Sequence, residues 1–484
     1  MSALDEKQQV ADANVEVVEN GAFKEDFVKD EAFDRRLIRK LDWKLLPFLS
    51  LLYLCSFLDR NAKLANITID LNVDGPTYNW ALSIFFIGYI LFEIPSNLLM
   101  KKIGPRTWIP IVMVAWSLVM MCMVACKNAA GLLAARFFLG VAEAGLFPGV
   151  IFYLSLWYNR SEQASRVAIF FGAATVAGAL GGLLAFGIVQ MAGIRGLAGW
   201  QWLFILEGAP VAVIAIIAYF YLPDFPENSK FLNAKERSYL VARLAHDAGP
   251  ASEKHFSWVQ FKDAFLDWKV PFHCIIYICA AVPLYSLSLF LPSIINGMGF
   301  TNVNAQAMSA PPFAIACLAL IIASISADRL RERGLHIGIL MLLGMLGYIL
   351  LIVLRSKGAV ALYIAAVITT TGVFSNAAAM VTWFTINFGG HTKRGVATAL
   401  MISFGNIGGA LGGQVYRAED APFYPRGHTI CACLMGFGAL TAFVFKILLN
   451  RENRRRDNLT PEQYQKELSR PEPADWHPDW RYIS

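Results

Sequence analysis

The sequence contains few charged residues for its length. Asp, Glu, Lys and Arg make up 16% of its 484 residues, whereas an ordinary soluble domain carries about 25%. Hydrophobic residues make up 56%, and the mean hydropathy is +0.48. A soluble protein of this length could not hide so much apolar surface, so long stretches of the chain must lie in lipid. This composition excludes an ordinary soluble protein.

The residue patterns of metal sites and enzymes are also lacking. The eight cysteines lie in apolar stretches without metal-ligand spacing, so we predict neither a metal site nor a disulfide framework. The apolar stretches contain no HExxH motif, paired aspartates or Ser/His constellation, and His273 and His428 stand at span ends without partners. We therefore expect no enzyme activity and no cofactor. The net charge of +6 comes from bases in connecting loops, which argues against nucleic-acid binding.

Twelve apolar segments, each long enough to cross a bilayer, follow one another along the chain. They predict an all-α membrane protein with twelve transmembrane helices in two six-helix bundles, 41–222 and 271–450. The fourth and tenth spans are predicted as Leu132–Leu156 and Val360–Phe384. A central loop, 223–270, is expected to be partly helical. A tail, 1–40, precedes the bundles, and a second tail, 451–484, is expected to be loosely ordered because it is rich in charge and proline.

Basic residues predict the orientation of these helices. Loops on the side of the N-terminus hold most of them, for example Lys101, Lys102, Arg331 and Arg333, while the other loops hold only scattered bases. Because basic loops stay in the cytosol, we expect both termini and the central loop to be cytosolic. We expect a multi-pass protein of the plasma membrane.

The chain also repeats itself. Gly178-Ala179-Leu180-Gly181-Gly182 recurs as Gly409-Ala410-Leu411-Gly412-Gly413, an offset of 231 residues (409 minus 178). A basic loop ending at Gly104 recurs in one ending at Gly334, an offset of 230 (334 minus 104). Six spans per copy give both copies the same orientation, so a two-fold axis along the membrane normal and a cavity between the halves are implied. For the glycines we favour tight helix packing over ligand contact.

Ionisable residues inside the spans are few, and each costs roughly 2.5–3.5 kcal/mol near the bilayer centre. Arg136 and Glu143, seven residues apart in the fourth span, share a helix face at a separation of about 10 Å. Arg136 could bind a substrate carboxylate and Glu143 could carry a proton. Asp59 and Arg60 end the first span. The alternative is a structural ion-pair network that packs spans one and four, and Asp59 and Arg60 could also extend to the interface. For Glu93 in the second span we favour a kink or gate role.

Several uncharged or paired polar residues complete the candidates. Tyr89 could present its hydroxyl to the cavity or simply pack. Asn376 and Asn406 could bind substrate or only a neighbouring helix. Asp328 and Arg329 are predicted to form a cytosolic gate pair, although the equivalent loop of the first half has no aspartate.

Seven segments together resemble a known family over roughly Phe33 to the end of the chain. They are Ser56-Phe57-Leu58-Asp59-Arg60, Glu93-Ile94-Pro95-Ser96-Asn97, 136–149 (RFFLGVAEAGLFPG), Leu222-Pro223-Asp224-Phe225-Pro226-Glu227, Thr392-Lys393-Arg394, Gly405-Asn406 and Pro478-Asp479-Trp480-Arg481-Tyr482. The chain resembles the major facilitator superfamily, within its anion:cation symporter group. It most resembles the fungal branch of allantoate, nicotinate and vitamin permeases.

This resemblance implies proton-coupled symport of a small organic anion. In that group, residues matching Arg60 and Arg136 bind the anion, and those matching Asp59 and Glu143 couple protons. Those matching Asn406 and Tyr89 are candidate substrate contacts. Two segments depart from the family pattern. Asn61-Ala62-Lys63-Leu64-Ala65-Asn66 replaces Thr-Asn-Ile-Gly-Asn-Ala, which affects substrate identity, and Lys101-Lys102-Ile103-Gly104-Pro105-Arg106 lacks the usual Asp-Arg pair, which affects gating.

The predicted function is therefore secondary active transport by alternating access. The substrate classes that fit are carboxylates such as a vitamin, a nicotinate-like compound, a ureide or a sugar acid. Two alternatives are a non-transporting nutrient sensor of the same fold and a proton-independent exchanger. We expect the partners to be the small organic anion and the lipid bilayer, with no nucleic acid, and the protein to be a monomer.

Overall fold

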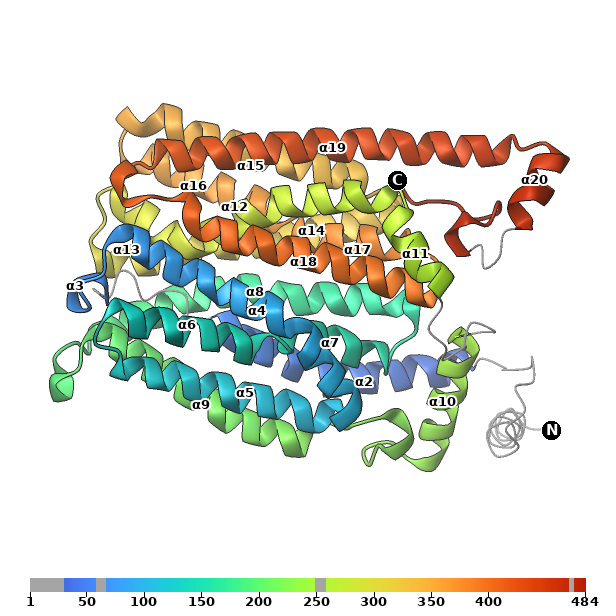
Figure 1. Cartoon of the computed structure of the whole chain (residues 1–484), viewed down its shortest axis with the longest axis horizontal. Helices are drawn as coiled ribbons and strands as arrows, with labels where there is room; N and C mark the ends of the chain where they lie inside the picture. The colour runs from blue at the N-terminus through green and yellow to red at the C-terminus, as the bar shows by residue number, and fades with distance from the viewer. Residues whose placement is uncertain (1–29, 58–66, 249–257, 470–473) are drawn as a thin grey trace.

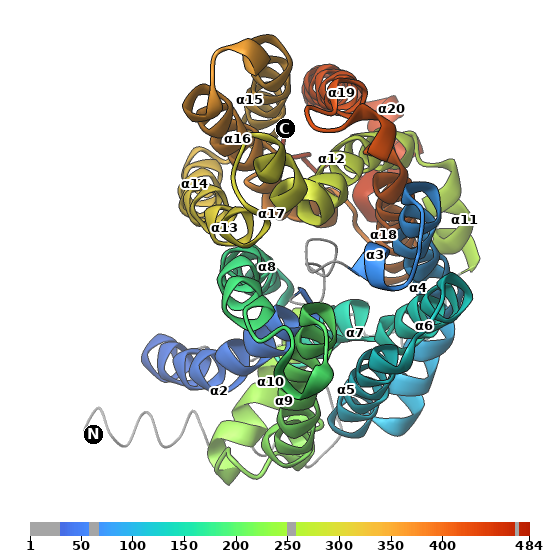
Figure 2. The ribbon, with the colours of Figure 1, turned by 90° about the vertical axis from the view of Figure 1, so that its left-hand side faces the viewer.

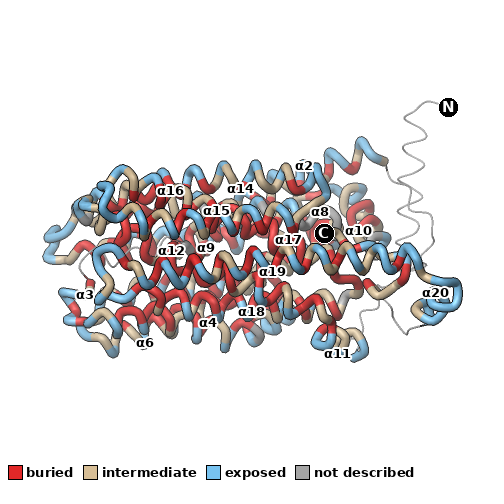
Figure 3. Tube along the Cα trace, turned by 90° about the horizontal axis from the view of Figure 1, so that it is seen from above, coloured by how far each residue is buried: buried red, intermediate tan, exposed pale blue. Residues whose placement is uncertain are grey.

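The computed structural model describes residues 30–57, 67–248, 258–469 and 474–484, and every regular element among them is a helix. Nine of these helices are long and apolar enough to cross a bilayer. Large apolar side chains such as Phe220 and Val360 are 75% and 76% exposed, and Figure 3 shows exposed residues along the outer faces of the bundle. Such a surface suits lipid. The predicted all-α membrane fold is confirmed.

These nine helices and three further long ones, Glu31–Phe57, Gly75–Ile103 and Arg160–Val189, form two bundles of six spans (Figure 1). The spans of the N-half are α2 (Glu31–Phe57), α4 (Gly75–Ile103), α5 (Pro105–Cys122), α6 (Ala129–Glu143) with α7 (Leu146–Ser155), α8 (Arg160–Val189) and α9 (Gly199–Tyr221). The spans of the C-half are α12 (Lys269–Gly297), α14 (Ala310–Leu330), α15 (Gly334–Val353), α16 (Ala359–Phe374) with α17 (Ala377–Ile386), α18 (His391–Val415) and α19 (Pro425–Asp457).

Shorter helices lie outside the spans. They are α3 (Ile67–Asp70), α10 (Ala234–Ala248), α11 (Trp258–Leu266), α13 (Asn302–Met308) and α20 (Pro461–Leu468), with 3-10 turns at Met123–Ala125, Ile194–Gly196, Pro226–Asn228, Leu354–Ser356, Ala418–Asp420 and Ala474–Trp476. The central loop is partly helical, as predicted. In Figure 1, α10, α11 and α20 mark one end of both bundles, which we call the terminal end, while α3 and α13 mark the opposite end, which we call the far end.

The fourth and tenth spans are each broken in the middle, where the sequence predicts continuous helices. The first piece ends at Glu143 in one half and at Phe374 in the other, an offset of 231 residues (374 minus 143). Pro148 explains the first break, because it has no N–H to donate to the carbonyl of residue 144. At the second break, the Asn376 side chain donates to the Gly372 carbonyl over 3.2 Å. The breaks therefore repeat at the sequence offset, with different local causes.

The two halves meet where α4 packs against α18 and where α8 packs against α13, α14 and α17 (Figure 2). The repeated glycine motif lies at both places. A Cβ at Gly178 would lie 2.8 Å from the Phe313 ring, and a Cβ at Gly409 would overlap the Phe86 ring. At Gly182 a Cβ would overlap the Gln306 backbone. These glycines therefore serve close packing, and the packing joins the halves toward the far end.

An ion-pair cluster closes the terminal end of the N-half. Arg243 on α10 pairs with Asp34 near the start of α2 over 2.6 Å and with Glu162 near the start of α8 over 2.5 Å. Arg243 and Asp34 are each only 3% exposed. Because α10 follows the sixth span, the central loop returns to tie the first and fifth spans together. We call these three residues the N-half ion-pair cluster.

A second cluster closes the terminal end of the C-half. Asp475 pairs with Lys269 at the start of α12 and with Lys393 near the start of α18. Asp267 pairs with the same two lysines over 3.1 and 2.6 Å. All four residues are at most 1% exposed. These residues, the C-half ion-pair cluster, tie the first and fifth spans of their half through the segment that follows the twelfth.

The signs of the charges are reversed between the clusters. Lys393 stands 231 residues after Glu162, and Asp475 stands 232 after Arg243 (393 minus 162, 475 minus 243). An arginine therefore lies between two carboxylates in the N-half, and a carboxylate lies between two lysines in the C-half.

The described part of the C-terminal tail is packed, contrary to the prediction of a loosely ordered segment. Arg456 donates to the carbonyls of Asp475 and Trp480 over 3.0 and 2.9 Å and to the Tyr482 hydroxyl over 2.8 Å. Asn387 donates to the Ile483 carbonyl over 2.8 Å. Two of the tail's charged residues, Arg456 and Asp475, are buried in these contacts.

Candidate functional site

A cavity of about 570 Å³, its open mouth included, lies where the two halves meet. Its lining comes from α2, α4, α6 and α7 in the N-half and from α12 and α18 in the C-half. Seven of the lining residues are aromatic: Tyr53, Phe85, Phe86, Tyr89, Phe147, Tyr277 and Tyr285.

Glycines bring the helices of the N-half side of this cavity together. A Cβ at Gly140 on α6 would overlap the Phe85 backbone on α4, and one at Gly88 would overlap the Phe137 carbonyl. The two backbones therefore touch at this level. This approach places Tyr89 of α4 beside Glu143, the last residue of α6.

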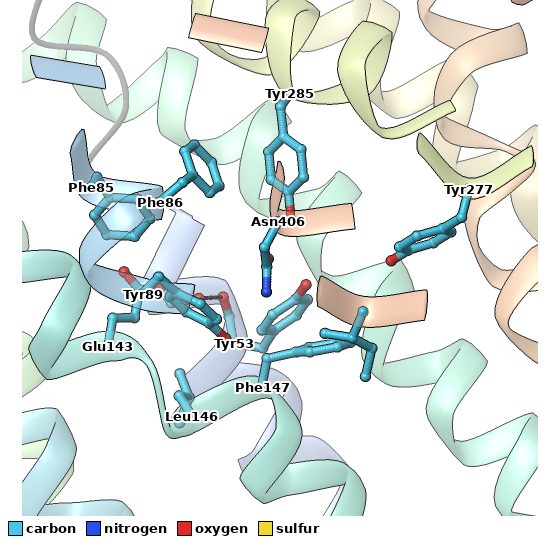
Figure 4. A pocket seen from close by; sticks show the side chains of 12 residues that line it. Tyr53, Phe85, Phe86, Tyr89, Glu143, Leu146, Phe147, Tyr277, Tyr285 and Asn406 are labelled. Carbon is cyan, nitrogen blue, oxygen red and sulfur yellow. Dashed lines mark hydrogen bonds between the residues drawn. The ribbon is translucent and has the colours of Figure 1, made fainter. Parts of the chain in front are cut away.

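Three predicted site residues line the cavity together. Tyr89 and Glu143 reach it from the N-half and Asn406 from the C-half, as Figure 4 shows. Each is 7–8% exposed. The Asn406 amide donates to the Glu93 carboxylate over 2.9 Å, which links α18 to α4. A carboxylate, an amide and several phenol hydroxyls thus surround one space, and they can donate and accept hydrogen bonds with a small polar ligand.

The other predicted substrate contacts lie elsewhere. Arg136 is 6% exposed and lies beside the Phe204 ring, 5.8 Å from its centroid, rather than in the cavity lining. It precedes Glu143 by two helical turns toward the far end of α6. Asn376 is fully buried at the break of the tenth span, where its amide binds its own helix. Asp59 and Arg60 lie outside the described residues.

The predicted gate residues stand at the terminal end of α14. Asp328 pairs with Arg333 in the loop that follows, and Arg329 lies in the last turn of the helix. The equivalent loop of the N-half, between α4 and α5, contains no aspartate. Asp224 lies against it instead, and its Oδ1 accepts a hydrogen bond from the Arg106 backbone N–H over 3.4 Å. The carboxylate absent from that loop is therefore supplied by the segment that opens the central loop.

Sequence reasoning did not find Tyr53, Tyr277 and Tyr285. Each stands in an otherwise apolar run, where a tyrosine looks like a packing residue. The available signal was spacing, because Tyr277 and Tyr285 are eight apart, close to two helical turns, and so share one face of α12. Within the described ranges, no group of three or more His, Cys, Asp or Glu side chains is placed to hold a metal ion.

A sequence profile described as the Major Facilitator Superfamily matches residues 49–413, most of the chain. The chain belongs to the Major Facilitator Superfamily. Similar curated proteins are transporters from fungi. The chain is 35% identical over 457 residues to "MFS transporter prlL" of a fungal species (strain NRRL 50135), covering 91% of this chain and 92% of that protein. It is 38% identical over 396 residues to "Uncharacterized transporter C1002.16c" of Schizosaccharomyces pombe, covering 81% and 79%.

Solved structures of this superfamily share the fold. A D-xylose–proton symporter aligns with a TM-score of 0.64 at 12% identity, covering 83% of this chain and 97% of that one. A bacterial homologue of the human lysosomal transporter Spinster, described as inward-facing and unoccupied, aligns with a TM-score of 0.59 at 16% identity, covering 87% and 96%. Family, fold and relatives together identify a membrane transporter.

Proposed function

We propose that this major facilitator protein is a proton-coupled symporter of a small organic anion in the plasma membrane. The observation that carries the proposal is the cavity between the halves, which Glu143 and Asn406 enter from opposite sides. A buried carboxylate in such a cavity is a costly group that proteins keep for function. Here its function is to carry a proton.

Arg136 supplies the positive charge for the anion in this proposal. It lies about two turns from Glu143 on α6, between the cavity and the far end. A substrate that enters from the far end meets the guanidinium before it reaches Glu143. Arg60 is the second proposed anion contact. Binding a carboxylate and a proton together neutralises the charges in the cavity, which lowers the cost of closing the apolar halves around it.

The structure corresponds in this proposal to the inward-facing state. The glycine contacts that the halves make at Gly178, Gly182 and Gly409 lie toward the far end. The positive-inside rule places the terminal end in the cytosol. Rocking of the halves would separate the far-end contacts and open the cavity to the outside.

Uptake by purified protein in proteoliposomes tests this function. A panel of labelled carboxylates is offered with and without an inward proton gradient. We expect at least one to accumulate only with the gradient. Glu143→Gln should abolish gradient-driven accumulation and leave exchange of substrate across the membrane measurable. The exposed Glu419→Gln is the matched control and should behave like the wild type. Gradient-driven accumulation that survives in Glu143→Gln would refute the proton role, and accumulation without any gradient would favour an exchanger.

A further inference from the structure

One buried carboxylate joins the halves without lining the cavity. Glu93 on α4 is 7% exposed and accepts the hydrogen bond from Asn406 on α18. Among the described residues no basic side chain forms an ion pair with it. Asn406 lines the cavity, so Glu93 stands directly behind the cavity wall.

This hydrogen bond is the innermost of a series along the α4–α18 interface. Starting at the far end, Asn79 donates to the Tyr416 carbonyl over 2.9 Å, and Ser83 donates to the Ala410 carbonyl over 2.7 Å. Glu93 and Asn406 follow. One turn further, Ser96 instead accepts from Trp108 of its own half over 3.0 Å. Separating the halves at the far end must therefore break the bond between Glu93 and Asn406.

The protonation state of Glu93 changes the strength of that bond. An ionised carboxylate accepts a charge-assisted hydrogen bond, which is roughly twice as strong as a neutral one. If the halves separate, an ionised Glu93 also loses its donor while it is still buried in an apolar surround. A protonated Glu93 loses only a neutral hydrogen bond. Ionisation therefore favours the joined far end, and by linkage joining the far end favours release of the proton.

Other titratable groups surround Glu93. Tyr89, one turn earlier on α4, interacts electrostatically with both Glu93 and Glu143, and Tyr277 on α12 interacts with Glu93. The tyrosines remain neutral phenols in the range of pH in which carboxylates titrate. Glu143 is the one other carboxylate among these neighbours, so the test must separate the two.

We propose that Glu93 is a proton-binding residue that acts through Asn406 on the opening of the far end. A proton from water bonds to the Glu93 carboxylate while the far end is open. When the halves join and Asn406 donates to that carboxylate, the O–H bond breaks and the proton leaves toward the cavity. The use of this proton for symport rests on the proposed function, but its effect on opening does not.

Spin-label distances in nanodiscs, without substrate or gradient, test this effect. The labels are placed on cysteines introduced at the exposed far-end positions Ile69 and Arg417, one in each half, with the exposed Cys122 and Cys433 replaced by serine. Between pH 8 and pH 5.5 we expect the ratio of open to joined far ends to rise about tenfold, the difference between a charge-assisted and a neutral hydrogen bond.

Glu93→Gln should lose this pH response, and Glu93→Asp should retain it. Ser83→Ala is the matched control, because it removes two hydrogen bonds of the same interface that cannot titrate, the one to the Ala410 carbonyl and the one from Gln414. It should raise the open population equally at both pH values and keep the tenfold response. Glu143→Gln should also keep the response.

A wild-type response in Glu93→Gln would overturn the proposal. If Glu93→Gln does not fold, Asn406→Ala removes the donor instead, and a wild-type response there overturns it equally. Failure of Glu143→Gln to alter uptake would refute only the proton role of Glu143 in the proposed function and would leave the role of Glu93 standing.

Discussion

Replacing Asp475 by Asn should destabilise the C-half by leaving a buried charge unpaired. The C-half ion-pair cluster holds two carboxylates and two ammonium groups, so its net charge is zero. Asn keeps the shape of the side chain and can still accept the hydrogen bond that the Gly389 N–H donates to Oδ1 over 3.1 Å. The variant also replaces Oδ2, which accepts from Lys269 and Lys393, by an amide nitrogen that cannot accept, and it leaves a net charge of +1 among residues at most 1% exposed.

The magnitude follows from the burial of the cluster. Removing one partner of a buried ion pair costs about 3–5 kcal/mol. Asp267 still faces both lysines, so we expect the lower end, about 3 kcal/mol. If the C-half unfolds as a unit of about 200 residues, this corresponds to a fall in the unfolding temperature of about 6–12 °C.

Thermal unfolding of the purified protein, followed by tryptophan fluorescence at a fixed heating rate, measures this fall. Asp479→Asn is the control, because the Asp479 side chain is 66% exposed, and it should unfold at the wild-type temperature. A second variant tests whether the unpaired positive charge causes the destabilisation. Adding Lys393→Met to Asp475→Asn leaves Asp267 and Lys269 as a neutral pair, so the double variant should be more stable than Asp475→Asn alone. Wild-type stability of Asp475→Asn, or a double variant less stable than the single one, would refute the reasoning.

Two further predictions concern acid stability and helix packing. Burial opposes ionisation of Asp267, but Lys269 and Lys393 outweigh burial and hold its pKa below the ordinary 3.8. The contribution of ionised Asp267 to stability should therefore be complete above pH 3.8 and be lost as the pH falls through the lower pKa of the folded state. Below pH 4, the unfolding temperature of Asp267→Asn should consequently fall less than that of the wild type. Gly140→Ala should lower the free energy of unfolding by about 1–3 kcal/mol, because its Cβ would overlap the Phe85 backbone. A Cβ at Gly187 would have no atom within 4 Å, so Gly187→Ala should not lower the unfolding temperature. Equal unfolding temperatures for the two variants would contradict the packing argument.

The sequence alone identified residues whose energetic cost does not depend on distant parts of the chain. Charges in an apolar run are costly wherever the helix lies, so Glu143 could be found without a structure, and it does line the cavity with Tyr89 and Asn406. The glycine motifs likewise revealed the repeat, because close helix packing requires small side chains at fixed positions. The offset of 231 residues then reappeared in the helix breaks at Glu143 and Phe374.

Features that depend on distant partners could not be predicted in this way. Lys269 and Asp475 are 206 residues apart, and nothing near either residue indicates the other. Charge and proline in the tail therefore suggested disorder, although the tail closes a buried cluster. Helical spacing also placed Arg136 and Glu143 on one face of a helix. It could not show that Glu143 lines the cavity and Arg136 does not, because the extent of the cavity depends on side chains from α2 and α12.

The reversed signs of the two ion-pair clusters bear on how the protein assembles during synthesis. Each cluster is completed by a residue that follows all six spans of its own half, Arg243 in the first and Asp475 in the second. Arg243 is made before the C-half, and it would be repelled by Lys269 and Lys393 there. Asp475 would be repelled by Asp34 and Glu162 in the same way. Because the two halves share one repeated fold, the segments that carry Arg243 and Asp475 could in principle bind to the wrong half. Their opposite charges make each segment selective for the half that precedes it in the chain.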